Sequence, residues 1–342
     1  MRPARVTLIT ALVVAVSAAA PAVAASKAVP VDPSARVALG VTTLRLAAGW
    51  YFPWSASDLN SVNQVERQLH RHLEIVNLFQ DWAHSAKPPL TALEQIRARG
   101  SVPEISWEPW NADPKASPRP TQQPAYSLAS IISGTHDAYI RTWARGLKQF
   151  GRPVLLRFAQ EMNIRSYSWD EGVNSNTKGQ YVQAWRHVWR LFHNLGVRNV
   201  AWVWSPVAAT LRKSDYPGGA YVNVIGVSGF NGGTLPGWDG WRSFNQIFSH
   251  TLTELHAMAP AKPVQITEIG SSTHGGNKSQ WVRGMFAALK SYPYVTSVVS
   301  YDLKKQADWR IDSSASALAA FRAGAGTARY GQIASSKITG RL

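Results

Sequence analysis

The sequence has 342 residues, no cysteine and a formal net charge of +16 at pH 7. The lack of cysteine excludes disulfide bonds and thiol chemistry, so stability has to come from packing in a large core. The positive charge favours acidic polymers or an anionic cell envelope as neighbours, but the basic residues are scattered along the sequence, which argues against nucleic-acid recognition.

The first 24 residues have the features of a secretory signal peptide. Arg2 and Arg5 precede an apolar run from Val6 to Ala18, and Ala22 to Ala24 offer the small residues of a cleavage site. The apolar run is shorter than the roughly 20 residues that a transmembrane helix needs. We therefore expect a secreted protein with a mature charge of +14 after loss of the two arginines, in which residues 25–36 form a short lead.

Strand-like and helix-like segments alternate from residue 37 to residue 325. Eight apolar segments have the composition of strands: Val37–Thr42, Ile75–Phe79, Val102–Trp107, Val154–Phe158, Val200–Trp204, Val222–Val227, Val264–Thr267 and Val295–Tyr301. Apolar residues recur at helical spacing between them, mainly in Leu59–Leu69, Ile140–Phe150, Tyr181–Leu195, Phe244–Met258 and Trp281–Leu289. Eight such units in about 290 residues predict a single-domain α/β fold, the (β/α)8 TIM barrel, over residues 37–325. Residues 326–342 are interpreted as a loosely held C-terminal tail.

Two glutamates follow strands on opposite sides of this predicted barrel. Glu161 comes after the fourth strand and Glu268 after the seventh. Because the active sites of TIM barrels lie at the C-terminal ends of the strands, the two carboxyl groups can meet across the mouth. A retaining glycosidase needs two carboxyl groups about 5 to 5.5 Å apart. The pair therefore predicts a glycoside hydrolase with Glu161 and Glu268 as catalytic residues.

The surroundings of the two glutamates suggest different roles. Glu161 is flanked by apolar and aromatic residues, among them Phe158 and Trp169, and partial desolvation there would keep it protonated as the general acid. Glu268 is flanked by Thr267 and Ser271, and Arg157 can reach it across the barrel, which would hold it ionised as the nucleophile.

These motifs resemble glycoside hydrolase family 26. The segment 160–169 is similar to the acid/base motif of the family, and the segment 266–271 is similar to its nucleophile motif, within a likeness that covers about residues 37 to 321. The resemblance implies a (β/α)8 enzyme that cleaves a β-linked polysaccharide with retention. The substrate is most often β-1,4-mannan, and in some members mixed-linkage β-glucan or β-1,3-xylan. It also implies that no metal or organic cofactor takes part.

Nine further residues are candidate substrate contacts: Arg157, Gln160, Asn163, Tyr167, Trp169, Trp107, Phe230, Tyr301 and Trp309. This chain differs from the family at five positions, of which Ile164 and Ser166 replace a glycine and a tryptophan that usually shape the subsites. Gln160 replaces a histidine beside the acid/base, and Ser228 and Phe230 stand where mannanases have an aspartate and a tyrosine. Phe230 cannot donate the hydrogen bond that this tyrosine gives to the nucleophile, so we expect another donor such as Tyr301 to replace it.

Two alternatives stay open at this point. The changes at Gln160 and Phe230 are also compatible with a secreted carbohydrate-binding barrel that has lost catalysis. The basic surface is compatible with electrostatic association with an anionic cell envelope, which would weaken as salt increases. The expected partner in either case is a polysaccharide bound by a monomer, with no nucleic acid and no metal.

Overall fold

A computed structural model describes residues 38–42, 46–47, 50–51, 56–113, 121–330 and 334–340. The predicted signal peptide and lead lie outside the described residues, as does Val37. Within these ranges, no helix combines the length and the apolar character that crossing a membrane requires.

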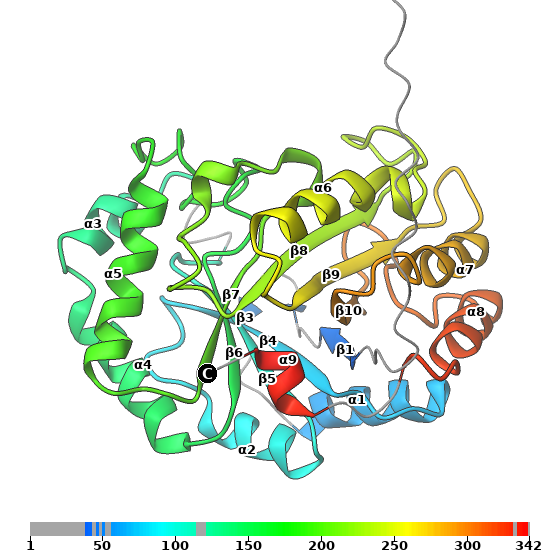
Figure 1. Cartoon of the computed structure of the whole chain (residues 1–342), viewed down its shortest axis with the longest axis horizontal. Helices are drawn as coiled ribbons and strands as arrows, with labels where there is room; N and C mark the ends of the chain where they lie inside the picture. Colours follow the sequence, from blue (N-terminus) through cyan, green and yellow to red (C-terminus); the bar gives the residue numbers. More distant parts are fainter. Residues whose placement is uncertain are drawn as a thin grey trace, which may run out of the picture. The chain divides into compact units, whose positions relative to one another are not determined.

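Eight parallel strands close into a barrel, in which β1 pairs with both β4 and β10 (Figure 1). The barrel strands are β1 (Ala38–Thr42), β4 (Ile75–Asp81), β5 (Val102–Glu108), β6 (Val154–Phe158), β7 (Val200–Trp204), β8 (Val224–Asn231), β9 (Val264–Ser271) and β10 (Val295–Tyr301). The predicted TIM barrel is therefore confirmed. The strands β8 and β9 continue four residues beyond their predicted ends, and these extensions contribute to the mouth of the barrel.

Helices connect the strands and surround the barrel: α1 (Ala56–Leu69), α2 (Leu90–Ala98), α3 (Leu128–Ile132), α4 (Asp137–Phe150), α5 (Gln180–Asn194), α6 (Phe244–Met258), α7 (Lys278–Leu289) and α8 (Ala315–Ala325). Short 3-10 helices lie at Pro124–Tyr126, Ala208–Thr210 and Lys213–Asp215, and β2 (Leu46–Ala47) pairs with β3 (Trp50–Tyr51).

Local sequence signals account for where several of these helices begin and end. The Ser243 side chain accepts a hydrogen bond from the backbone of Gln246, whose own side chain bonds back to Ser243, so α6 begins with a capping box. The helix α4 ends at Gly151, which has the left-handed φ of 66° that a glycine adopts without steric cost. The helix limits predicted from apolar spacing thus agree with the structure to within a few residues.

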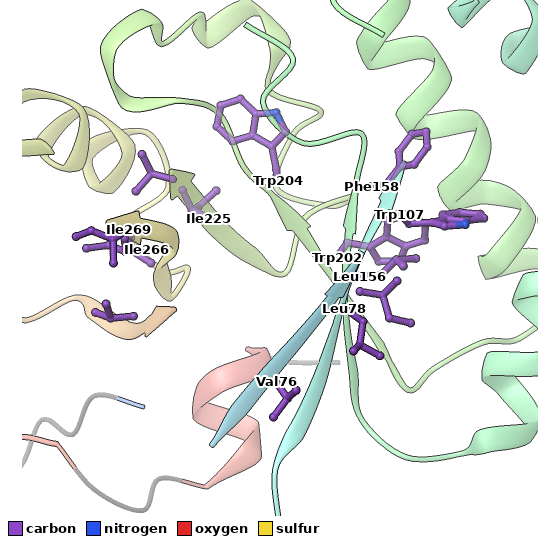
Figure 2. Packing of buried hydrophobic residues seen from close by; sticks show 14 of the residues in the cluster. Val76, Leu78, Trp107, Leu156, Phe158, Trp202, Trp204, Ile225, Ile266 and Ile269 are labelled. Carbon is purple, nitrogen blue, oxygen red and sulfur yellow. The ribbon is translucent and has the colours of Figure 1, made fainter. Parts of the chain in front are cut away.

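The strands bury two different faces. Residues such as Val76, Leu78 and Leu156 point outward and pack under the helices in the main core (Figure 2). Their neighbours Ile75 and Leu155 point inward and form a smaller apolar layer in the lower barrel. Above that layer the interior is polar, and this polar column leads up to the two catalytic candidates.

The C-terminal segment corrects one prediction. Residues 326–342 were expected to be a loose tail, but Tyr330 is buried and the short helix α9 (Ser335–Thr339) places Ile338 against the lower barrel layer. A closed barrel leaves apolar side chains exposed at its lower end, and Ile338 covers them. Tyr330 and Ile338 are therefore part of the core.

Candidate active site

Glu161 lies on irregular backbone directly after β6. Ala159 and Glu161 have positive φ angles of 45° and 56°, which residues other than glycine rarely adopt. The Glu161 amide donates to the carbonyl oxygen of Ser205 at 2.8 Å, which fixes the turn against the end of β7. Such strained residues cluster at functional sites. The turn aims the Glu161 side chain, which is only 9% exposed, at the barrel mouth.

Glu268 lies on β9 beside a second irregularity. The pairing of β8 with β9 shifts register between Val227 and Ser228, and Glu268 pairs there with Ser228. The outward-facing residues Ile266 and Ile269 are three positions apart, rather than the even number that a regular strand requires. A bulge of this kind re-aims a side chain. Here it allows Glu268 to join the inward-facing polar column.

Ser228 links the two carboxylates. Its Oγ donates a hydrogen bond to Oε1 of Glu161, and its backbone is the sheet partner of Glu268. Both glutamates are thus brought to one place, as their positions after the fourth and seventh barrel strands predict. Ser228 is buried and neutral, so it orients Glu161 without adding charge.

Loss of the Ser228 hydroxyl is expected to impair proton donation by Glu161. A hydrogen bond to a charged group contributes about 1.5–3 kcal/mol, so Ser228→Ala should lower kcat about 10- to 100-fold. The loss should be largest on substrates with poor leaving groups, because these need the proton most. Kinetics on a leaving-group series will measure this. Ser297→Ala is the matched control, because Ser297 is a buried barrel serine whose Oγ has no partner among the described residues; an equal loss there would contradict the assignment.

Arg157 is the charged partner of Glu268, as predicted. Its Nη1 donates to Oε1 of Glu268 and, at 3.2 Å, to Oγ of Ser106. Burial raises the pKa of Glu268 to about 7, and the nearby Glu161 adds to the rise, while Arg157 opposes it. The sequence led us to expect a simply ionised Glu268. The ion pair with Arg157 favours this charged form, while the depth of burial favours the protonated one.

Two buried carboxylates beside this pair were missed from the sequence. Glu108 accepts a hydrogen bond from Nε2 of Gln160 at 2.6 Å, and Glu104 accepts one from Gln265 at 2.7 Å. Both lie on β5, each two positions from Ser106, so all three side chains point into the barrel. Polar residues alternating within an apolar strand were the signal that could have revealed them. Gln160 is fully buried and bonds to Glu108, so it supports the site rather than reaching a sugar.

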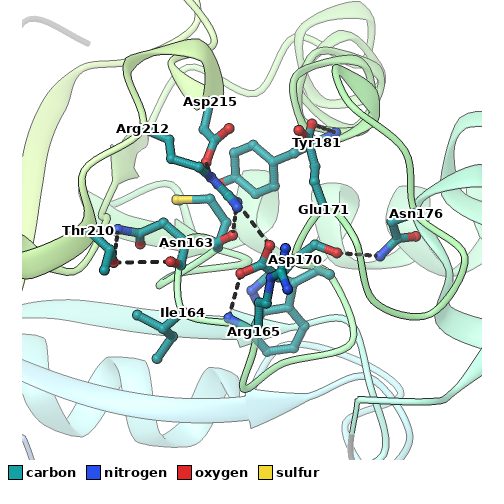
Figure 3. A network of polar contacts seen from close by, with 12 residues as sticks. Asn163, Ile164, Arg165, Asp170, Glu171, Asn176, Tyr181, Thr210, Arg212 and Asp215 are labelled. Atoms are coloured by element: carbon teal, nitrogen blue, oxygen red, sulfur yellow. Dashed lines mark hydrogen bonds and ion pairs between the residues drawn. The ribbon is translucent and has the colours of Figure 1, made fainter. Parts of the chain in front are cut away.

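The loop after Glu161 is held by a polar network (Figure 3). Asn163 donates to the carbonyl of Val207 and to Oγ1 of Thr210, both at 2.9 Å, and Arg212 pairs with Asp170 at 2.9 Å. These contacts join the loop that follows β6 to the loop that follows β7. Asn163 was predicted as a substrate contact, but its side-chain amide is committed to this network.

Three other predicted substrate contacts are also buried too deeply to touch a sugar. Trp107 and Arg157 are both 0% exposed, and Trp107 packs against Trp82 and Trp143 under the helices. Trp169 is 0% exposed behind Tyr167, with the two rings stacked 4.5 Å apart. Stacking on a sugar requires an accessible face, so we correct the assignment of these residues. They support the site from within.

Replacement of Trp107 by phenylalanine tests this correction. We expect a loss of roughly 2 kcal/mol in unfolding free energy, because the smaller ring leaves a cavity in the core. The KM should stay within about twofold of the wild-type value, since the ring meets no substrate. Chemical denaturation and steady-state kinetics provide the two measurements. A large rise in KM with unchanged stability would restore Trp107 as a sugar platform.

An aromatic cluster forms one side of the mouth. The Phe230 ring lies 5.4 Å from Tyr301 and 5.2 Å from Trp309, and Trp238, at 37% exposed, extends the cluster outward. Tyr167 is half-buried and is the remaining predicted contact. Burial and the charges of Glu268 and Glu161 raise the pKa of Tyr301, which places this residue in the field of both carboxylates. Tyr301 was expected to replace the missing tyrosine as donor to Glu268, but within the described residues it makes no hydrogen bond to Glu268. The donor to Glu268 is Arg157.

Comparisons with known proteins point to one family of enzymes. Residues 123–288 match the profile of glycosyl hydrolase family 26. Endoglucanase H of Acetivibrio thermocellus is 33% identical over 272 residues, which cover 77% of this chain and 28% of that protein. A β-1,3-xylanase, TXYA, of a Vibrio species is 31% identical over 109 residues, which cover 30% of this chain and 22% of that protein. The chain thus spans about a quarter of the length of these relatives.

A solved structure confirms the fold. The modular endo-β-1,4-mannanase from Cellulomonas fimi superposes with a TM-score of 0.64 at 18% identity, over 90% of this chain and 73% of that chain. At this level of identity the likeness concerns the architecture alone.

Proposed function

Because this chain belongs to glycoside hydrolase family 26, we propose that it hydrolyses a β-linked polysaccharide by double displacement on Glu161 and Glu268. The observation that carries the proposal is the arrangement around Ser228. This residue bonds to one carboxylate and pairs in the sheet with the other, where the acid/base and the nucleophile of a retaining enzyme are needed.

The reaction has two steps. Glu161 gives its proton to the glycosidic oxygen while a carboxylate oxygen of Glu268 attacks the anomeric carbon, so the leaving chain departs as an alcohol and a glycosyl ester forms. Glu161, now ionised, takes a proton from water, and the water oxygen displaces Glu268 with overall retention. Arg157 stabilises the ionised Glu268 before attack and after release.

The substrate that we propose is a mixed-linkage β-glucan, with β-1,4-mannan as the second candidate. The support is the 33% identity to an endoglucanase over 77% of the chain. Ser228 and Phe230 also depart from the mannanase pattern described above. Ser228 bonds to Glu161, and Phe230 packs against Tyr301, which lies in the field of both carboxylates. We further propose that the enzyme acts outside the cell, on the basis of the signal-like first 24 residues.

Product release from a glycan panel tests the proposal. The purified chain would be incubated with mixed-linkage β-glucan, mannan, galactomannan, β-1,3-xylan and an acidic polysaccharide, with Glu161→Ala in parallel. We expect oligosaccharides from β-glucan, lost in Glu161→Ala and kept in Glu94→Ala, a surface control on α2. Binding of one glycan without any product would overturn catalysis and support the non-catalytic carbohydrate-binding barrel.

A further inference from the structure

Basic residues that are scattered in the sequence form one surface on the outside of α4 and α5. These two helices contact each other on the outside of the barrel (Figure 1). Along α4 and just beyond its end, the basic residues follow each other at intervals of four, three and four positions, and α5 and the loop after it add three more. The resulting basic face consists of Arg141, Arg145, Lys148, Arg152, Arg186, Arg190 and Arg198.

The spacing places these side chains on one side of each helix. Residues three and four apart are neighbours on a helix surface, so Arg141, Arg145 and Lys148 form a stripe along α4. The two helices are held in register by Lys148, whose Nζ donates to the carbonyl of Leu195 at the end of α5. The stripe on α4 therefore runs beside the basic residues of α5.

Little acidic charge compensates this face. On the two helices Asp137 is the one acidic residue, and it is engaged by Arg141 at 2.8 Å and by His187 at 2.6 Å. The side chains of three exposed arginines, Arg145, Arg152 and Arg190, have no hydrogen-bond or ion-pair partner among the described residues. Like charges four residues apart destabilise a helix, so these basic residues do not favour the fold itself.

An aromatic side chain lies within the basic residues of α5. Trp189 is half-buried, stacks on His193 at 4.6 Å and meets the edge of Tyr221 at 5.0 Å. The guanidinium of Arg186 lies 4.9 Å from the centre of the Tyr221 ring. Cations beside aromatic rings suit a ligand that carries both negative charge and sugar-like apolar faces.

We propose that this basic face is a docking surface for an anionic polysaccharide, separate from the catalytic mouth. The ligand is a linear glycan with carboxylate or phosphodiester groups, of the kind found in cell envelopes, lying along α4 and α5. Its binding keeps the enzyme near a surface while the mouth acts on a neutral β-glycan. This use of the charge is independent of which β-glycan is hydrolysed.

Binding of defined polymers tests the proposal. The full chain would be titrated with polygalacturonate, with a glycerol-phosphate polymer, with double-stranded DNA and with neutral β-glucan. The wild-type chain should bind the two anionic polymers. Its affinity for them should fall as the salt concentration rises, since exposed charges are screened over about 10 Å at 0.1 M salt. The relative strength of the carboxylate and the phosphodiester polymers identifies the anionic group. Tighter binding of DNA than of either polymer would overturn the assignment to a glycan.

A pair of triple variants locates the surface. Arg145→Gln, Arg152→Gln and Arg190→Gln together remove three charges from the basic face. The matched control, Arg67→Gln, Lys290→Gln and Lys337→Gln, removes three exposed charges elsewhere. We expect the first variant to bind the anionic polymer at least about tenfold more weakly and the control to change less than about threefold. Equal weakening would mean that net charge alone drives binding and would overturn the proposal. Thermal unfolding of both variants verifies that the fold is intact.

Discussion

Replacement of Glu268 by alanine is expected to lower kcat by at least about 10⁴-fold, because the nearby carboxylates Glu104 and Glu108 are held by Gln265 and Gln160 and do not replace it as the nucleophile. The effect on KM should be small, since Glu268 is only 5% exposed and offers little area for ground-state binding. Steady-state kinetics on the substrate found with the glycan panel will measure both. Glu94→Ala, an exposed glutamate on α2, controls for loss of a carboxylate as such. A fall in kcat of less than tenfold in Glu268→Ala would contradict the assignment of Glu268 as the nucleophile.

Azide distinguishes the roles of the two glutamates. With an activated β-aryl glycoside, azide can enter the space left in Glu268→Ala and attack the anomeric carbon directly, which gives the α-glycosyl azide. In Glu161→Ala the glycosyl ester still forms, and azide then displaces Glu268 to give the β-glycosyl azide. Product stereochemistry by NMR therefore assigns nucleophile and acid/base separately. The reverse pattern would exchange the two roles.

The sequence was sufficient to predict the framework, because its signals are local. Apolar runs such as Val264–Thr267 specify strands, and the spacing of Phe244–Met258 specifies a helix. The position of two glutamates at strand ends was enough to select them, since the barrel brings strand ends together.

The orientation of the same two glutamates was beyond sequence reasoning. Glu161 depends on a positive φ held by the carbonyl of Ser205, and Glu268 depends on a register shift between β8 and β9. Both are set by contacts between distant segments, so no local pattern reports them. A simple alternation would have pointed Glu268 outward with Ile266.

For Trp107, the sequence does contain a signal for its buried position, namely the alternation along β5. Glu104, Ser106 and Glu108 alternate with it on β5 and point into the barrel, so the period of two places Trp107 on the opposite, helix-facing side. The burial of Ile338 in the C-terminal segment could not be predicted from the sequence, for a different reason. Ile338 becomes part of the core only because the closed barrel leaves an apolar lower end, which is a property of the whole fold.

Replacement of Arg157 by methionine is expected to be the most damaging change outside the two glutamates. Arg157 is fully buried and lowers the pKa of both Glu268 and Glu104, although burial holds each at about 7. Without the guanidinium both pKa values should rise further, so more of the nucleophile is protonated at neutral pH. We expect kcat/KM at pH 6 to fall at least about 100-fold, and the acidic limb of its pH profile to move to higher pH.

The stability of the Arg157→Met variant should depend on pH in a defined direction. A carboxyl whose folded pKa lies above its unfolded value of 4.5 stabilises the fold below that value, and the contribution is lost as pH rises through the folded pKa. Loss of Arg157 raises the folded pKa further, so destabilisation should be small near pH 5 and should approach about 3–5 kcal/mol near pH 8, where a buried charge is left unpaired. Denaturant unfolding at both pH values will measure it.

A double variant separates charge from packing. If the uncompensated carboxylate is the cause, Glu268→Gln should restore part of the stability lost in Arg157→Met at pH 8, with the remainder due to Glu104. At pH 5 the Glu268→Gln change should restore little stability, because Glu268 already carries a proton at that pH. Equal losses at both pH values with no restoration would mean that Arg157 acts mainly by filling space. The predicted pattern instead follows from one guanidinium shared by two buried carboxylates, in which the same ion pair supports the fold and keeps the nucleophile ready to attack.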